Sequence, residues 1–156
     1  MNLILGDSLV SDLELGKAAE HLVCADLILK GFRAYLTDQG IPYDVVVDLN
    51  GKLIRIQVKA TAGPRAIPQR KMFTPSYLWH VRRAGKKGRR RYGSADFDLL
   101  ALVAVDIQKI AYLKVDEGVK TTVHLRPPHS PITSRNKILK NIDQYPFSEA
   151  INAFTR

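Results

Sequence analysis

Asp44, Gln57 and Lys59 are three residues whose side chains suit the hydrolysis of a phosphodiester bond. Mg²⁺ and similar hard divalent ions prefer oxygen ligands, which the Asp44 carboxylate, the Gln57 amide and the backbone carbonyl of Val58 would supply. Lys59 would place the attacking water and help to deprotonate it, or stabilise the charge that develops on the phosphate. These residues are therefore a candidate site for metal-assisted attack on a nucleic acid.

A β-hairpin is expected to bring these side chains together. Two β-like stretches, Tyr43–Leu49 and Lys52–Ala60, flank Asn50-Gly51, a dipeptide typical of a two-residue type I′ turn. Such a turn pairs residues whose numbers sum to 101, so Asp44 lies opposite Gln57, on the same face as the lysine two residues further on. A slip of one residue would move the strand's side chains to the other face, so the site depends on this turn.

The two faces of the expected hairpin differ in polarity, because side chains alternate between faces along a strand. An apolar face fit for the core holds Tyr43, Val45, Val47, Leu49, Ile54, Ile56 and Val58. The other face holds Asp44, Val46, Asp48, Arg55, Gln57 and Lys59. An edge strand that shows polar residues to solvent would have the same pattern, and spacing alone leaves this simpler alternative open.

A helix is expected before the hairpin. Ser11 followed three residues later by Glu14 forms a capping-box pattern, and Gly31 after Lys30 suits a left-handed helix end. Between them, apolar residues at helical spacing predict one packed face, formed by Leu15, Ala18, Ala19, Leu22, Ala25 and Leu29.

The rest of the chain predicts more strands and two short helices. The expected strands are Phe32–Leu36, Tyr77–Arg83, Asp98–Val105 and Lys109–Val115, and the expected helices are Arg135–Asn141 and Phe147–Phe154. A helix, several strands, mixed connections and terminal helices together indicate an α/β fold class. Among the aromatic residues, Trp79 is expected in the core, whereas stacking on bases and packing in the core are equally open for His80.

The distribution of charge points to a polyanionic partner. The chain has 24 basic and 15 acidic residues, a net charge of +9. No acidic residue occurs between Leu49 and Ala95, a segment with thirteen lysines and arginines, so the remaining chain carries −4. Such asymmetry favours nucleic acid over a membrane surface, because no amphipathic helix accompanies the positive charges.

A loop within this basic segment, residues 82–91, is the candidate nucleic-acid-binding element. Its positive residues are Arg82, Arg83, Lys86, Lys87, Arg89, Arg90 and Arg91. Glycines interrupt the run, which suits an arm that lies along the phosphate backbone. A loop that is merely solvated is the simpler alternative. Asp96 and Asp98 follow the loop and are expected to cap it or to form ion pairs with it.

Length and composition limit the possible classes of protein. A chain of 156 residues, with 46% hydrophobic and 25% charged residues, suits one globular domain. No apolar run approaches the roughly 20 residues of a membrane span, and the start of the sequence does not resemble a signal peptide. The single cysteine, Cys24, cannot form an internal disulfide and is expected to pack as a small apolar residue. We expect a cytoplasmic protein without a membrane partner.

Three segments resemble the PD-(D/E)XK nuclease superfamily, namely Gly16-Lys17-Ala18-Ala19-Glu20, Pro42-Tyr43-Asp44 and Gln57-Val58-Lys59-Ala60-Thr61. The superfamily core is a helix followed by a β-hairpin that carries an acid and a (D/E)-x-K tripeptide. The pattern is most similar to small homing endonucleases encoded in bacterial group I introns, which use Gln in place of the usual acid. Archaeal Holliday-junction resolvases are more distantly similar. The resemblance is good from Glu14 to Thr61 and weaker across Asp98–Val105.

This resemblance implies a restriction-endonuclease-like core, with an N-terminal helix followed by a mixed β-sheet and flanking helices. It also implies that Asp44 and Gln57 ligate the metal, that Lys59 assists the water, and that Glu20 projects from the first helix toward the same site.

The sequence departs from the family pattern at two positions. Tyr43 separates Pro42 from Asp44, so the literal "PD" is absent, and Gln57 removes one carboxylate from the metal site.

We therefore expect one nuclease domain over residues 1–156 that cuts double-stranded DNA with Mg²⁺ or Mn²⁺, as a site-specific homing-type endonuclease. One such site cuts one strand, so cleavage of a duplex predicts a homo-oligomer, either a dimer or a tetramer. Two alternatives stay open: a nuclease that resembles Holliday-junction resolvases, and a non-catalytic nucleic-acid-binding protein on the same scaffold.

Overall fold

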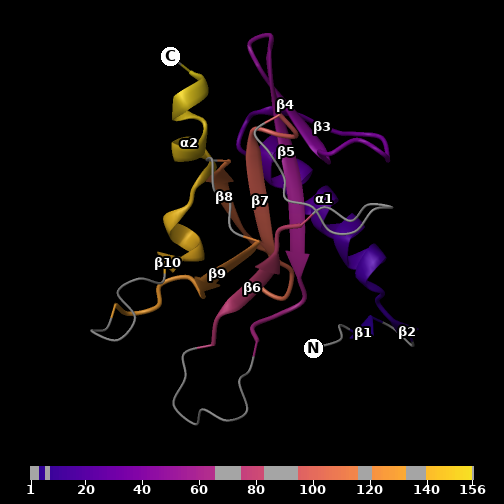
Figure 1. Ribbon diagram of the computed structural model, residues 1–156, viewed down its shortest axis with the longest axis vertical. Coiled ribbons are helices and arrows are strands. Elements are labelled where there is room, and N and C mark those ends of the chain that lie inside the picture. Colours follow the sequence, from indigo (N-terminus) through magenta and orange to yellow (C-terminus); the bar gives the residue numbers. More distant parts are fainter. Residues whose placement is uncertain are drawn as a thin grey trace.

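The computed structural model describes residues 4–5, 8–65, 75–82, 95–115, 121–132 and 140–155. Its centre is a five-stranded sheet in the order β3-β4-β5-β7-β8 (Figure 1). The strands are β3 (Arg33–Leu36), β4 (Val45–Leu49), β5 (Lys52–Thr61), β7 (Leu99–Ala104) and β8 (Lys109–Lys114). β5 and β7 are parallel and the other neighbours are antiparallel, so the sheet is mixed as expected.

The Asn50-Gly51 turn has the conformation that the sequence predicts. Both residues have positive φ, 51° and 92°, and the Gly51 amide donates to Asp48 Oδ1 over 2.6 Å. The β4–β5 ladder runs from Leu49 opposite Lys52 to Val45 opposite Ile56, which is the predicted register. The hairpin that positions the candidate site is therefore confirmed.

Helix α1 (Asp12–Leu29) has the predicted ends. Ser11 and Glu14 form a reciprocal capping box, and Gly31 has φ 89° just beyond the helix. The predicted packed face is wrong in part: the buried residues are Ala19, Val23 and Leu27, while Ala18, Ala25 and Leu29 are exposed. The buried residues follow an i, i+4 spacing through Val23. The predicted face omitted Val23 because it was based on the spacing of the alanines.

Two hydrophobic cores lie on opposite faces of the sheet. The first lies under α1 and the short helix α2 (Phe147–Ala150), which both pack on one face. The second lies beneath a small three-stranded sheet on the other face, formed by β6 (Tyr77–His80), β9 (Thr122–Arg126) and β10 (Lys140–Asn141). Within that core Trp79 is 1% exposed and donates its indole N–H to the Val103 carbonyl over 3.1 Å, whereas His80 is exposed.

Several expected elements need correction. The sequence did not predict β9 and β10. The predicted helix at Arg135–Asn141 is wrong at its end, because Lys140–Asn141 is a strand that pairs with β9. Residues 133–139 lie outside the described part of the chain. The C-terminal helix is divided into α2 and a 3₁₀ turn at Asn152–Phe154. At the N-terminus β1 (Ile4–Leu5) and β2 (Ser8–Leu9) form a small ladder. No helix in the described ranges is long and apolar enough to cross a membrane.

Candidate functional site

Asp44 lies at the entrance to β4, where it is tied to β5 by backbone and side chain. Its amide donates to the Ile56 carbonyl over 2.8 Å. Its carboxylate Oδ2 accepts hydrogen bonds from the Gln57 side-chain Nε2 at 2.6 Å and from the Val58 amide at 2.8 Å. The predicted convergence of Asp44 and Gln57 is therefore present in the structure.

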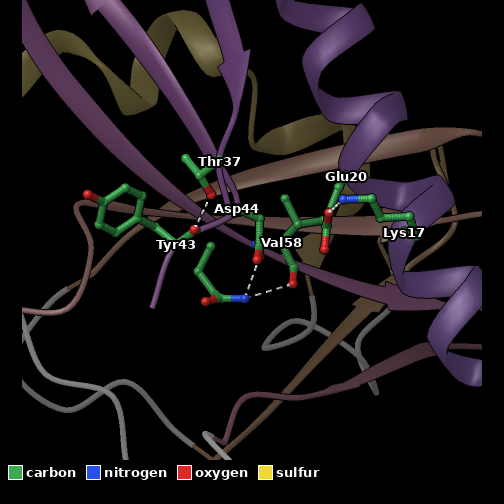
Figure 2. A network of polar contacts seen from close by, with 7 residues as sticks. Lys17, Glu20, Thr37, Tyr43, Asp44 and Val58 are labelled. Atoms are coloured by element: carbon green, nitrogen blue, oxygen red, sulfur yellow. Dashed lines mark hydrogen bonds and ion pairs between the residues drawn. The ribbon is translucent and has the colours of Figure 1, made fainter. Parts of the chain in front are cut away.

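Gln57 is 7% exposed and its amide lies between two oxygen atoms. Besides the Asp44 carboxylate, Nε2 contacts the Val58 carbonyl oxygen at 3.2 Å (Figure 2). β5 is a central strand of the sheet, so the alternative of an edge strand that shows polar residues to solvent does not hold. A buried polar group on a central strand needs partners, and here the partners are the oxygens of the candidate metal site.

Glu20 reaches the same site from α1. Figure 2 shows its side chain extending from the helix toward Val58 and Asp44. Its Oε2 accepts an ion-pair hydrogen bond from Lys17 Nζ at 3.0 Å, a contact that the sequence did not predict. Both partners belong to the Gly16–Glu20 segment, and their i, i+3 spacing was the available signal.

Tyr43 does not lie on the face expected for it. The sequence placed its ring with Val45 in the first core, but it packs against the second core on the other side of the sheet. The reason is that β4 begins at Val45, so the alternation of a strand does not extend back to Tyr43.

The electrostatic surroundings shift the pKa values of Asp44 and Lys59. Burial raises the pKa of the Asp44 carboxyl, the Val58 amide hydrogen bond opposes that effect, and the charge of Glu20 adds to it. Burial lowers the pKa of the Lys59 ammonium, although the Asp44 charge opposes this shift. Asp44 is thus hydrogen-bonded to Gln57, it shares a cleft with Glu20, and its pKa responds to the charge of Lys59.

A cleft of about 590 Å³ opens beside the site, between α1 and the β3–β4 connection. Glu20 and Asp44 both line it, together with Lys17 and the residues from Thr37 to Ile41. Of the four predicted side chains, Glu20 and Asp44 are thus the two that this cleft exposes.

The donor set suits a hard divalent cation. The NH₂ group of the Gln57 side chain contacts both Asp44 Oδ2 and the Val58 carbonyl oxygen. This group is the positive end of the amide dipole, so the two oxygens already face one positively polarised partner. Rotating the carboxamide by half a turn would present its oxygen instead, and Glu20 adds a further carboxylate. In the described ranges no cluster of three or more His, Cys, Asp and Glu residues could hold a metal.

Most of the predicted DNA-binding loop lies outside the described residues. Arg82 is exposed just beyond β6, whereas Arg83, Lys86, Lys87, Arg89, Arg90 and Arg91 fall in the undescribed range. Asp98, expected to cap or pair with that loop, forms an ion pair with Arg55 of β5, with Nη2 and Oδ1 3.0 Å apart.

The family model of the PD-(D/E)XK endonuclease matches residues 11–148, which include the helix, the hairpin and β7. The chain belongs to this family. The superfamily resemblance of the three sequence segments is thus confirmed, and the chain carries a nuclease domain whose relatives generally use divalent metals.

A solved structure supports the restriction-endonuclease-like fold. The bacterial homing endonuclease I-Ssp6803I superimposes with a TM-score of 0.58 and 18% identity, over 84% of this chain and 85% of that chain. A comparison with curated proteins finds no match.

Proposed function

We propose that this PD-(D/E)XK protein is a DNA endonuclease that depends on Mg²⁺ or Mn²⁺ and cuts at specific sites in the manner of a homing endonuclease. The observation that carries the proposal is the pair of hydrogen bonds that the Asp44 carboxylate accepts from the Gln57 side chain and the Val58 amide. The charges of Glu20 and Lys59 also act on this carboxylate. These groups combine oxygen ligands with a positive side chain, as hydrolysis of a phosphodiester requires.

Each residue has a distinct role in this proposal. Asp44, the Gln57 amide oxygen and the Val58 carbonyl hold the cation, and Glu20 completes its surroundings from α1. When bound, the divalent cation supplies positive charge that polarises the scissile phosphate and makes water easier to deprotonate. Lys59 Nζ, whose pKa burial lowers, hydrogen-bonds the attacking water or the phosphate oxygen that gains negative charge.

The basic loop 82–91 contributes affinity for double-stranded DNA in this proposal. Positive side chains that neutralise phosphates position a duplex without reading its sequence. The lining of the cleft beside Asp44 includes Asp12, Glu14 and Asp38, which would repel a phosphate backbone, so the duplex approaches from the side of Lys59.

The proposal extends over residues 1–156 as one nuclease domain that works as a homo-oligomer. A single site of this kind cuts one strand, so a dimer or tetramer is needed for both strands of a duplex. Sedimentation of the purified protein with and without a DNA duplex measures this directly. A monomer under all conditions that still makes double-strand breaks would contradict the assembly.

Incubation with supercoiled plasmid tests the proposed activity. Conversion to nicked and linear forms is expected with Mg²⁺ or Mn²⁺ and not with EDTA. Equal amounts of a four-way junction and a random duplex distinguish a homing-type enzyme from one that resembles a junction resolvase. DNA binding without any cleavage would instead favour the non-catalytic alternative, which the missing carboxylate at Gln57 makes the strongest competitor.

A further inference from the structure

Arg55 is held rigidly beside the candidate site by the residues that follow the basic loop. Its Nε donates to Asp98 Oδ2 at 3.1 Å and its Nη2 to Oδ1 at 3.0 Å, a two-pronged contact with the carboxylate. Its Nη1 donates to the Ala95 carbonyl at 2.8 Å, and its backbone amide also donates to Asp98. Because its donors are bound to Asp98 and Ala95, we assign the guanidinium a structural role and not a contact with a DNA phosphate.

The same guanidinium covers the ring of Tyr43. Arg55 Cζ lies 5.9 Å from the ring centroid, within the range of a cation–π contact. Because the contacts with Asp98 and Ala95 fix the guanidinium, the ring of Tyr43 has a defined place against it. Tyr43 immediately precedes Asp44 in the chain, so a restraint on this ring acts next to the proposed metal ligand.

Thr37 restrains the backbone of the same two residues. Its hydroxyl donates to the Tyr43 carbonyl over 2.6 Å (Figure 2), and its amide donates to the Asp44 carbonyl over 3.0 Å. On the β5 side, the Asp44 amide is bound to the Ile56 carbonyl. The Tyr43–Asp44 dipeptide is therefore fixed by side chain and backbone from both neighbouring strands.

These contacts account for the departure from the family motif. A proline directly before the acid would fix the backbone angle φ through its ring, but here Pro42 is one residue further away and Tyr43 has no such ring constraint. We propose that Tyr43, held at its ring by Arg55, which Asp98 fixes in turn, and at its carbonyl by Thr37, is the positioning residue that fixes Asp44. This inference rests on the proposed role of Asp44 as a metal ligand.

The test compares Tyr43→Ala, Arg55→Ala, the double variant and the conservative Tyr43→Phe in the full-length protein. Binding of Mn²⁺ is measured by electron paramagnetic resonance, and hydrogen exchange at the Asp44 amide by nuclear magnetic resonance. Each alanine variant is expected to weaken Mn²⁺ binding by about tenfold, the usual effect of removing a group that orients a ligand. The double variant should lose little more than either single one, because both act through one contact, and Tyr43→Phe should match the wild type.

A matched control is provided by another place where a basic side chain contacts both a carboxylate and an aromatic ring. Lys30 pairs with Asp26 and lies 5.6 Å from the ring centroid of Tyr112, whose hydroxyl also donates to Asp26. Lys30→Ala should leave Mn²⁺ binding and Asp44 amide exchange unchanged. Circular dichroism identifies any variant that fails to fold, and Arg55→Lys, which keeps the charge but loses the two-pronged contact, then replaces Arg55→Ala.

The possible failures are distinguishable. If the wild type binds no Mn²⁺, the proposed function is wrong. The positioning role is then decided by hydrogen exchange: faster exchange at the Asp44 amide in Tyr43→Ala supports it, and unchanged exchange overturns it. If the wild type binds Mn²⁺ and folded Tyr43→Ala and Arg55→Ala bind it equally well, the positioning proposal is overturned while the proposed function stands.

Discussion

Gln57 Nε2 lies 2.6 Å from Asp44 Oδ2, so the residue that replaces an acid of the family motif is hydrogen-bonded to the acid that remains. Two carboxylates in these positions would repel each other without a cation, whereas an amide and a carboxylate attract. The hairpin is therefore stable at this point before any metal arrives. The same substitution leaves one negative charge fewer to bind the metal.

Gln57→Glu is expected to strengthen Mg²⁺ binding and to retain cleavage, because it restores a carboxylate ligand. Gln57→Leu removes the amide oxygen and should abolish most cleavage, while the fold survives because the side chain is of similar size. Cleavage rates over a series of Mg²⁺ concentrations measure both effects. If Gln57→Leu cuts at the wild-type rate, Gln57 is not a ligand.

The Arg55–Asp98 ion pair predicts a contribution to stability that depends on pH. Burial raises the pKa of the Asp98 carboxyl, but hydrogen bonds and the charge of Arg55 outweigh burial, so the folded pKa lies below the unfolded one. The pair therefore stabilises the fold above the unfolded value, about 3.9, and this contribution is lost as the pH falls through the folded value.

Asp98→Asn should accordingly lower the free energy of unfolding at pH 7 by about 1 to 2 kcal/mol. Urea unfolding at pH 7 and at pH 3 measures the change, with the exposed Glu149→Gln on α2 as control. A loss of the same size at both pH values would show that the ion pair is not its cause.

The turn that sets the register predicts a further effect on stability. Gly51 has φ 92°, a conformation that costs other residues about 1 to 2 kcal/mol, so Gly51→Ala should reduce the free energy of unfolding by that amount. Gly63→Ala is the control, because a Cβ there meets the nearest atom, Asp106 Oδ2, at an ordinary 3.8 Å. Equal stability of the two variants would argue against the strain at Gly51.

Local sequence signals predicted the part of the fold that local interactions determine. The capping box of Ser11 and Glu14 and the Asn50-Gly51 turn each involve residues close in sequence, and both are present. Because the turn fixes the register, the meeting of Asp44 and Gln57 followed from the sequence.

Contacts between distant segments were beyond the reach of such signals. The pairing of Arg55 with Asp98 joins residues 43 positions apart, and β10 forms only because β9 lies beside it. Tyr43 was assigned to the wrong core because strand alternation was extended past the start of β4. A two-residue strand such as Lys140–Asn141 has no periodicity from which it could be predicted.

Neutralising the basic loop is expected to weaken DNA binding on all sequences about equally. If the loop contacts about four phosphates, it contributes roughly −3.6 to the slope of log K against log salt. Replacing Lys86, Lys87, Arg89, Arg90 and Arg91 with Gln should reduce the slope by several units, with little change in thermal stability. Fluorescence anisotropy over a series of salt concentrations measures the slope, and an unchanged slope would place the DNA-binding surface elsewhere.

Removing the side chains of Lys59 and Glu20 should reduce the cleavage rate to different extents. Lys59→Ala is expected to reduce cleavage by about 10² to 10⁴ because it removes the group that assists proton transfer. Glu20→Ala should reduce the rate less, since Glu20 approaches the site from α1 and has Lys17 as its own partner. Single-turnover cleavage of a radiolabelled duplex gives the rates, and a larger loss in Glu20→Ala than in Lys59→Ala would reverse the assigned roles.

The most direct test of the central claim is the single-turnover rate of Asp44→Ala with saturating Mg²⁺, together with its affinity for the same duplex. The rate should fall by about a thousandfold or more, because the bound cation contributes several kcal/mol to the transition state, while affinity for the duplex stays close to that of the wild type. Glu149→Gln, which removes an exposed carboxylate on α2, should cut normally. Cleavage by a folded Asp44→Ala variant at the wild-type rate would contradict the assignment of this site.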